Sequence, residues 1–174
     1  GFSASDLVFL DESGCNTDMT RRYAYSLGWS RAVDSAPLSK PKNTTILSSI
    51  QLNGTLHYTT FSGGTTVERF KRYLETDLLP HLNGNSVLVM DNMKSHHAKA
   101  VKNLLDSSGI RYIYLPPYSP DLNPIEKLWS KVKALLRKFK ARTLDALPNA
   151  LQHAFHNISP SNCSGWFRSC GYAL

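Results

Sequence analysis

Short, uninterrupted runs of hydrophobic residues punctuate this chain, and two of them end in an acid. Residues 7–10 are apolar and are followed by Asp11 and Glu12, and residues 87–90 are apolar and are followed by Asp91. Such brief runs are typical of central strands that are buried on both faces. We therefore predict two buried strands, each of which delivers an aspartate at its carboxyl end.

Other segments read as strands joined by tight turns. Residues 44–52 and 55–61 flank Asn53-Gly54, and this dipeptide is a strong short hairpin signal because both residues tolerate positive φ. Further strands are predicted over residues 21–29 and 110–115.

Four segments show the apolar spacing of helices. Thr65 and Glu68 have the spacing of a capping box, and Ser95 is a candidate N-cap for a helix that ends at Gly109. Asn123 followed by Pro124 suits an N-cap and a first helical position. Helices are therefore expected from residue 67 to an end near residues 80–84, and over residues 95–109, 124–139 and much of 146–157. The order of these elements predicts a mixed α/β domain.

Composition narrows the class of protein. The 174 residues suit one domain, and a hydrophobic share of 41% is ordinary for a globular chain. No apolar run could span a bilayer, the first residues do not resemble a secretory signal, and three cysteines suggest reduced thiols inside a cell. The net charge of +7 favours a polyanionic partner.

Three acids on separate elements suggest metal-dependent phosphodiester chemistry. Asp11 and Asp91 follow strands, and Glu126 lies in the first turn of a helix. Mg²⁺ prefers oxygen ligands, and two such ions can hold the attacking and leaving oxygens of an in-line displacement. Asp11 is the candidate to bridge both ions, with Asp91 and Glu126 completing one site each. Taken singly, each acid is as well explained as a loop residue or a helix-end charge.

The local motifs around these acids resemble one family. The segments Leu10-Asp11-Glu12-Ser13-Gly14 and Met90-Asp91-Asn92, and the segment from Pro116 to Trp129 (PPYSPDLNPIEKLW), closely resemble the catalytic domain of Tc1/mariner-type transposases, above all the bacterial IS630 group. The 34 residues between Asp91 and Glu126 match a spacing of that family.

The resemblance implies an RNase H-like, retroviral-integrase-like fold, a mixed sheet flanked by helices, with Asp11, Asp91 and Glu126 as the catalytic and metal-binding triad. It also implies two Mg²⁺ ions, replaceable by Mn²⁺, and double-stranded DNA as partner. The expected reaction is cleavage at transposon ends and transfer of the 3′-hydroxyl into target DNA, typically at TA. A homodimer on DNA, no membrane association and a bacterial cytoplasmic, nucleoid-associated location are expected with it.

The resemblance also sets the expected domain limits. Residues 1–174 form a single catalytic domain, with an RNase H-like core at about 6–142 and a C-terminal helix and tail at 143–174. The family's N-terminal helix-turn-helix recognition region is absent from this sequence. Two alternatives remain open: a metal nuclease of the same fold that performs no strand transfer, and a domesticated DNA-binding protein.

A basic stripe accompanies Glu126 on its helix. Residues 123–142 hold +6 of the net charge, and at about 100° per residue Lys133, Arg137 and Lys140 share the face of Glu126. We interpret these three residues as contacts to the DNA backbone. An ordinary solvated helix face is an equally good explanation.

Weaker signals are read conservatively. His96 and His97 follow Asp91 closely but are more simply surface residues, and Trp129 belongs to the apolar helix face. Glu12 should point away from Asp11 across the strand, which favours a supporting role. The spacing of two histidines and two cysteines near the C-terminus (His153, His156, Cys163 and Cys170) fits no common zinc pattern, and no motif of an NTPase, dinucleotide enzyme or serine hydrolase occurs.

Overall fold

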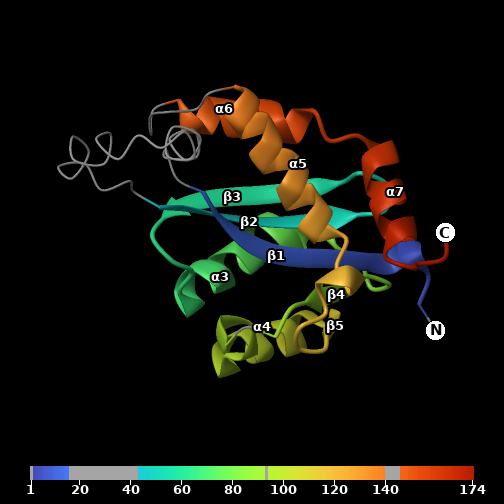
Figure 1. Ribbon diagram of the computed structural model, residues 1–174. Helices are drawn as coiled ribbons and strands as arrows, with labels where there is room; N and C mark the ends of the chain where they lie inside the picture. Colours follow the sequence, from blue (N-terminus) through green and yellow to red (C-terminus); the bar gives the residue numbers. More distant parts are fainter. Residues whose placement is uncertain (1, 16–42, 93, 140–145) are drawn as a thin grey trace.

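A central sheet separates two layers of helices (Figure 1). The computed structural model describes residues 2–15, 43–92, 94–139 and 146–174, so the strand predicted over 21–29 lies outside the described residues. The strands are β1 (Leu7–Cys15), β2 (Thr44–Gln51), β3 (Leu56–Ser62), β4 (Val87–Met90) and β5 (Arg111–Tyr114). Their order in the sheet is β3-β2-β1-β4-β5.

The sheet is mixed, as the sequence predicts. β1 pairs antiparallel with β2, which pairs antiparallel with β3 across the Asn53-Gly54 turn. On its other side β1 runs parallel to β4, and β4 runs parallel to β5. β4 ends at Met90, so Asp91 follows it as predicted, whereas β1 continues to Cys15, so Asp11 lies inside its strand and not at its end. Because β1 and β4 are parallel neighbours, Asp11 still lies beside Asp91.

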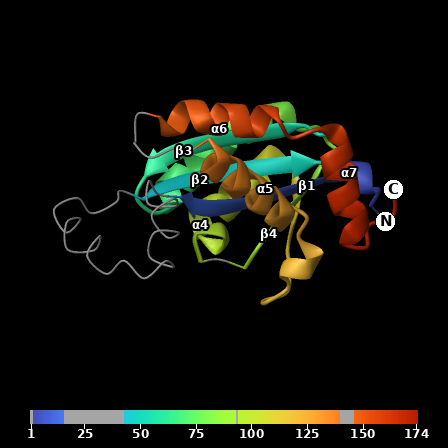
Figure 2. The same cartoon turned by 45° about the horizontal axis from the view of Figure 1, so that its top comes forward.

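Helices cover both faces of the sheet. The described α-helices are α3 (Val67–Tyr73), α4 (Lys99–Ser108), α5 (Ile125–Lys138), α6 (Leu147–His156) and α7 (Pro160–Ser169). A π-helical turn, Leu74–Leu78, and a 3-10 turn, Leu79–His81, prolong α3 to the end predicted near residues 80–84. Other short turns lie at Ala4–Asp6, Lys94–His97 and Pro120–Leu122. In Figures 1 and 2, α5, α6 and α7 lie on one face, and α3 and α4 on the other.

Each face has its own hydrophobic core, and β1 contributes to both. Phe9 packs with residues of α5, α6 and α7, while Val8 and Leu10 pack with residues of α3 and α4. This alternation confirms that β1 is buried on both faces, and the four residues of β4 are buried likewise. It also assigns Asp11 to the α5 face and Glu12 to the α3 face.

Three predicted helix starts differ from the structure. At α5 the cap is Pro124 and not the predicted Asn123, and the helix begins at Ile125. The cap of α3 is Thr66, whose side chain accepts the Arg69 N–H, and Thr65 is therefore free for another contact. The helix expected from Ser95 begins as a 3-10 turn, and α4 starts at Lys99 and ends, as predicted, at a left-handed Gly109. Local sequence identifies capping residues but fixes the first helical residue only to within one or two positions.

The C-terminal tail folds back onto the core as α7. Phe167 is fully buried and meets Phe9 edge to face, with 5.2 Å between ring centroids. The start of α7 abuts the β2–β3 turn, where a Cβ on Gly54 would lie 2.9 Å from the Pro160 Cα. Cys15 and Cys163 are buried free thiols, and Cys170 is partly exposed. None of the helices in the described segments is long and apolar enough to cross a membrane.

Candidate active site

Two aspartates lie side by side at the place where β4 ends. Leu10 of β1 is in register with Met90 of β4, so the next residue on each chain, Asp11 and Asp91, lies at the same edge. Asp11 is only 4% exposed, and Asp91 is half-buried on the wall of a cavity of about 430 Å³. The strand register thus brings together two residues that are 80 positions apart in the sequence.

Glu126 reaches the same cavity from another element. It is exposed in the first turn of α5, which begins at Ile125. Asn123 fixes this start, since its carbonyl oxygen accepts the Glu126 N–H at 3.1 Å and its Oδ1 accepts the Ile125 N–H at 3.4 Å. The proline-rich loop of residues 115–120 forms the rest of the wall, with Asn92 and Asn123.

Asp11 and Asp91 repel each other when both are ionised and no cation lies between them. Burial raises the pKa of Asp11 to about 8, and hydrogen bonding and charge repulsion from Asp91 add to that effect, with a smaller contribution from Glu126. Two carboxylates held this closely share one proton, because both cannot ionise without a compensating charge. A divalent cation supplies that charge, so the donor set fits a hard metal ion.

Glu126 does not complete a three-ligand metal site with Asp11 and Asp91. Within the described segments, no three side chains of His, Cys, Asp or Glu lie close enough to hold an ion between them. Glu126 instead lines the cavity that Asp91 also lines. The two aspartates are therefore the preformed part of the site.

Trp129 supports Asp11 from the core. Its indole is 4% exposed, as predicted for a core residue, and its Nε1–H donates to Asp11 Oδ2 at 3.2 Å. The prediction from sequence assigned Trp129 to packing and did not include this hydrogen bond. The available signal was that a buried indole N–H requires an acceptor, and that Trp129 lies one helical turn beyond Glu126.

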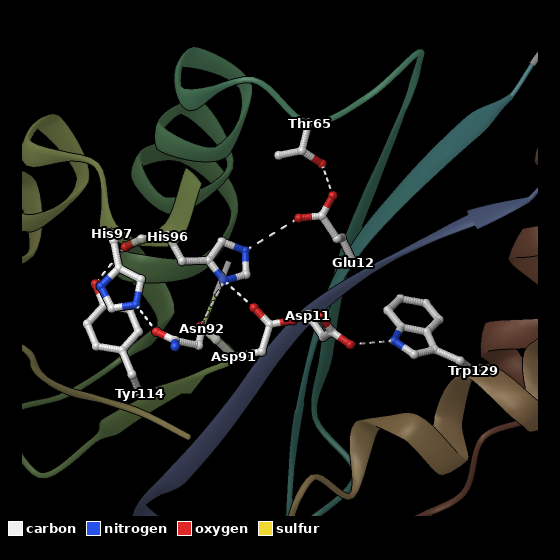
Figure 3. Close-up of polar contacts among 9 residues, drawn as sticks. All are labelled: Asp11, Glu12, Thr65, Asp91, Asn92, His96, His97, Tyr114 and Trp129. Atoms are coloured by element: carbon white, nitrogen blue, oxygen red, sulfur yellow. Dashed lines mark hydrogen bonds and ion pairs between the residues drawn. The ribbon is translucent and has the colours of Figure 1, made fainter. Parts of the chain in front are cut away.

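His96 is not the surface residue that the sequence suggested. It is fully buried, and its Nδ1 lies 2.7 Å from Asp91 Oδ1 while its Nε2 lies 3.4 Å from Glu12 Oε1 (Figure 3). Burial lowers the pKa of His96, but Asp91 and Glu12 raise it by more, to about 9. Glu12 points to the α3 face as predicted, where Thr65 Oγ1 donates to its Oε2.

His97 differs in its surroundings. Its ring is half-buried and stacks on Tyr114 with 3.8 Å between centroids, and its Nε2 contacts Asn92 Oδ1. The Tyr114 hydroxyl donates to the His96 carbonyl at 2.6 Å. These contacts tie the segment after β4 to β5.

The structure describes two of the three residues of the predicted basic stripe. Lys133 is half-buried close to Cys15, and its charge lowers the pKa of that thiol, although burial raises the pKa by more. Arg137 is exposed, and Lys140 lies outside the described residues. On the other flank of α5, Lys131 Nζ donates to Asn162 Oδ1 of α7 at 2.8 Å. The helix spacing places Lys133 and Arg137 on the side of Glu126.

Comparison with known proteins agrees with the motifs. The sequence model described as DDE superfamily endonuclease matches residues 6–148. The Tc1 transposase of Caenorhabditis elegans is 27% identical over 60% of this chain, which spans 44% of that relative's length. The predicted resemblance to Tc1/mariner transposases is confirmed, and the IS630 assignment stays a prediction.

Solved structures show the same fold. The Mos1 transposase in a paired-end complex superposes with a TM-score of 0.73 at 16% identity, covering 95% of this chain and 52% of that one. The catalytic core of BIV integrase superposes with a TM-score of 0.54 at 18% identity, covering 87% and 81%. The RNase H-like, integrase-like fold is thereby confirmed.

Proposed function

Because this chain belongs to the DDE superfamily endonuclease family, we propose that it is the catalytic domain of a DNA transposase, which cuts transposon ends and joins them to target DNA. The observation that carries the proposal is the register of β1 and β4, which sets Asp11 beside Asp91. The cavity lined by Asp91 and Glu126 gives a phosphodiester access to these acids.

The proposed cofactor is Mg²⁺, with Mn²⁺ as a substitute. Asp11 and Asp91 would hold one ion, and Asp11 with Glu126 would hold a second. Related structures support the choice, since the Mos1 catalytic domain has been solved with Mg and with Mn. When bound, such ions polarise the phosphate and lower the pKa of the attacking oxygen's proton.

The side chains of this chain prepare the site for that chemistry. Trp129 holds Asp11 Oδ2, and Asn123 sets the helix start that presents Glu126. In cleavage, an oxygen of water bonds to phosphorus as the bond to the 3′-oxygen breaks, leaving a 3′-hydroxyl and a 5′-phosphate. In strand transfer, that 3′-hydroxyl attacks a target phosphodiester and displaces its 3′-oxygen.

Double-stranded DNA is the proposed partner, with TA as the target and a homodimer bringing two ends together. Lys133, Arg137 and Lys140 are proposed to contact the backbone beyond Glu126, since phosphate contacts position a duplex without reading its sequence. The place of Lys133 and Arg137 on the Glu126 side of α5 supports this assignment.

A plasmid assay tests the proposal. Supercoiled DNA is incubated with the wild-type chain or Asp91→Ala in Mg²⁺, Mn²⁺, Ca²⁺ or EDTA. We expect nicking in Mg²⁺ or Mn²⁺ that is lost in EDTA and in Asp91→Ala. Calorimetry with Mn²⁺ is run in parallel. Nicking depends on DNA recognition by other residues, whereas metal binding at this site does not. Mn²⁺ binding that is absent, or unchanged by Asp91→Ala, contradicts the proposed site.

A second reaction separates transposition from simple hydrolysis. A pre-cleaved oligonucleotide with a free 3′-hydroxyl is offered with a target plasmid. Joined product supports a transposase, whereas nicking without joining supports a metal nuclease of the same fold. Binding without either reaction supports a non-catalytic DNA-binding protein.

A further inference from the structure

A continuous set of polar contacts lies on the α3 face of the sheet and ends at the two aspartates. It runs from Thr65 through Glu12 and His96 to Asp91 (Figure 3). We propose that His96 is a positioning residue, which fixes the Asp91 carboxylate for metal binding and is itself held by Glu12 and Thr65. The proposal rests on the proposed function, because it assigns Asp91 to metal ligation.

The first step is the contact between His96 and Asp91. Nδ1 of His96 lies 2.7 Å from Asp91 Oδ1 and 3.4 Å from the Asp91 carbonyl oxygen. An N–H on Nδ1 therefore points to both the side chain and the backbone carbonyl of Asp91. Groups that hydrogen-bond to metal-binding side chains orient them and tune their affinity.

The second step is the confinement of the imidazole ring. His96 has no exposed surface, and its ring stacks on Phe70 of α3 with 4.4 Å between centroids. The Tyr114 hydroxyl holds the His96 carbonyl at 2.6 Å. A buried polar ring is costly unless its nitrogens meet partners, so this packing selects one ring orientation.

The third step is the pair of residues, Glu12 and Thr65, that lies behind His96 on the α3 face of the sheet. Glu12 Oε1 faces His96 Nε2 at 3.4 Å, a charge contact that lacks the alignment of a hydrogen bond. Glu12 Oε2 accepts the hydroxyl of Thr65, the residue that does not cap α3. Glu12 does not line the cavity, and the contact of its side chain with Asp91 runs through His96.

The two ring nitrogens suggest a matched pair of substitutions. In His96→Asn the side-chain amide nitrogen takes the place of Nδ1 and keeps the contact with Asp91. In His96→Gln it takes the place of Nε2 and keeps the contact with Glu12. Both variants place a neutral amide in the same buried space, and they differ in the contact that they retain and in one methylene group of length.

Mn²⁺ affinity measured by calorimetry is the test. We expect His96→Gln to weaken Mn²⁺ binding by about 10- to 100-fold, as changes behind metal ligands do. His96→Asn should stay within about threefold of wild type, and Glu12→Gln should weaken binding by about fivefold from outside the cavity. Leu105→Ala in the core of the α4 face controls for general destabilisation, and it should lower the melting temperature but leave Mn²⁺ affinity unchanged.

Each other outcome overturns a distinct claim. Equal losses in His96→Asn and His96→Gln, or none in either, contradict positioning through Nδ1. Should neither variant fold, Glu12→Gln alone decides, and wild-type Mn²⁺ affinity in that variant overturns the proposal. If Asp91→Ala abolishes Mn²⁺ binding while all three variants bind normally, the proposed function survives and the positioning role fails. No Mn²⁺ binding by the wild type overturns both.

Discussion

Asp11 and His96 both hold protons in the folded protein that they lose in the unfolded chain. Burial and Asp91 raise the pKa of Asp11 to about 8, and Asp91 and Glu12 overcome burial to raise that of His96 to about 9. Since the folded state then binds more protons, raising the pH favours the unfolded state. The two shifts act in the same direction.

The metal-free protein should therefore become less stable with rising pH. We expect its melting temperature to fall between about pH 5 and pH 9, as the unfolded state releases protons that the folded state retains. Asp11→Asn removes one of the two titrations and should flatten the curve below about pH 8. Thermal scans at fixed ionic strength measure this, and a melting temperature that rises over this range would contradict the assignment.

The indole of Trp129 offers a second test at this scale. Trp129→Phe keeps an aromatic ring in the core but removes the N–H that Asp11 Oδ2 accepts. Leaving a buried acceptor without its donor should lower the free energy of unfolding by about 1–3 kcal/mol, measured in urea. Trp166→Phe on α7 is the matched control. An equal effect of both substitutions would show that the hydrogen bond contributes nothing.

The residues of the site were predictable to different degrees. The motifs and elements that hold Asp11, Asp91 and Glu126 are visible in the sequence, so the proposal of these three residues needs no structure. The contacts of Trp129 and His96 were not predictable, because each joins residues on different elements. Only the packing of α5 and the turn before α4 against the sheet brings those partners together.

At the scale of the element, α5 combines packing, chemistry and charge. Its buried face holds the core, Glu126 opens its first turn, and Lys133 and Arg137 follow on the same side. A helix presents such faces only because 3.6 residues make a turn, so a charge change on one flank leaves the buried face intact.

Charge reversal on the two flanks of α5 tests the basic stripe. Lys133→Glu with Arg137→Glu should weaken DNA binding by at least about tenfold and flatten its dependence on salt, because phosphate contacts release counterions. Lys127→Glu with Lys138→Glu changes the net charge equally and should do less. Binding measured by fluorescence anisotropy across a salt series gives both quantities. Equal losses from both pairs would refute the stripe.

Elements were more predictable than their ends. The runs at β1 and β4, the Asn53-Gly54 hairpin and α5 are all present, because burial on known faces decides them. Thr65 and Thr66 illustrate the remainder. Either can cap a helix, and the choice of Thr66 leaves Thr65 for Glu12, a contact that depends on the placement of α3 against β1.

At the scale of the whole molecule, α7 completes the core that the sheet and α5 begin. The tail of the sequence is rich in serine and glycine, and its few apolar residues gave no clear helical pattern. Ser159 nevertheless forms a capping box with Asn162, and Phe167 enters the core beside Phe9. Tertiary packing decides this helix, and local preference alone does not reveal it.

Removing that contact should destabilise the whole domain. Phe167→Ala leaves a cavity against Phe9 and should cost about 3–5 kcal/mol of unfolding free energy in urea. Phe139→Ala, at the half-exposed end of α5, should cost about 1 kcal/mol or less. Similar losses for both would mean that α7 is not part of the cooperative core.

The hydrogen bond between Trp129 and Asp11 also makes the site self-reporting. An indole emits light whose colour and yield depend on the charge at its N–H, so a cation arriving on Asp11 should alter the emission of Trp129. Replacing Trp29 and Trp166 by phenylalanine leaves Trp129 as the one tryptophan of the three in the sequence. A fluorimeter can then follow the loading of the site in real time, without a label and without DNA.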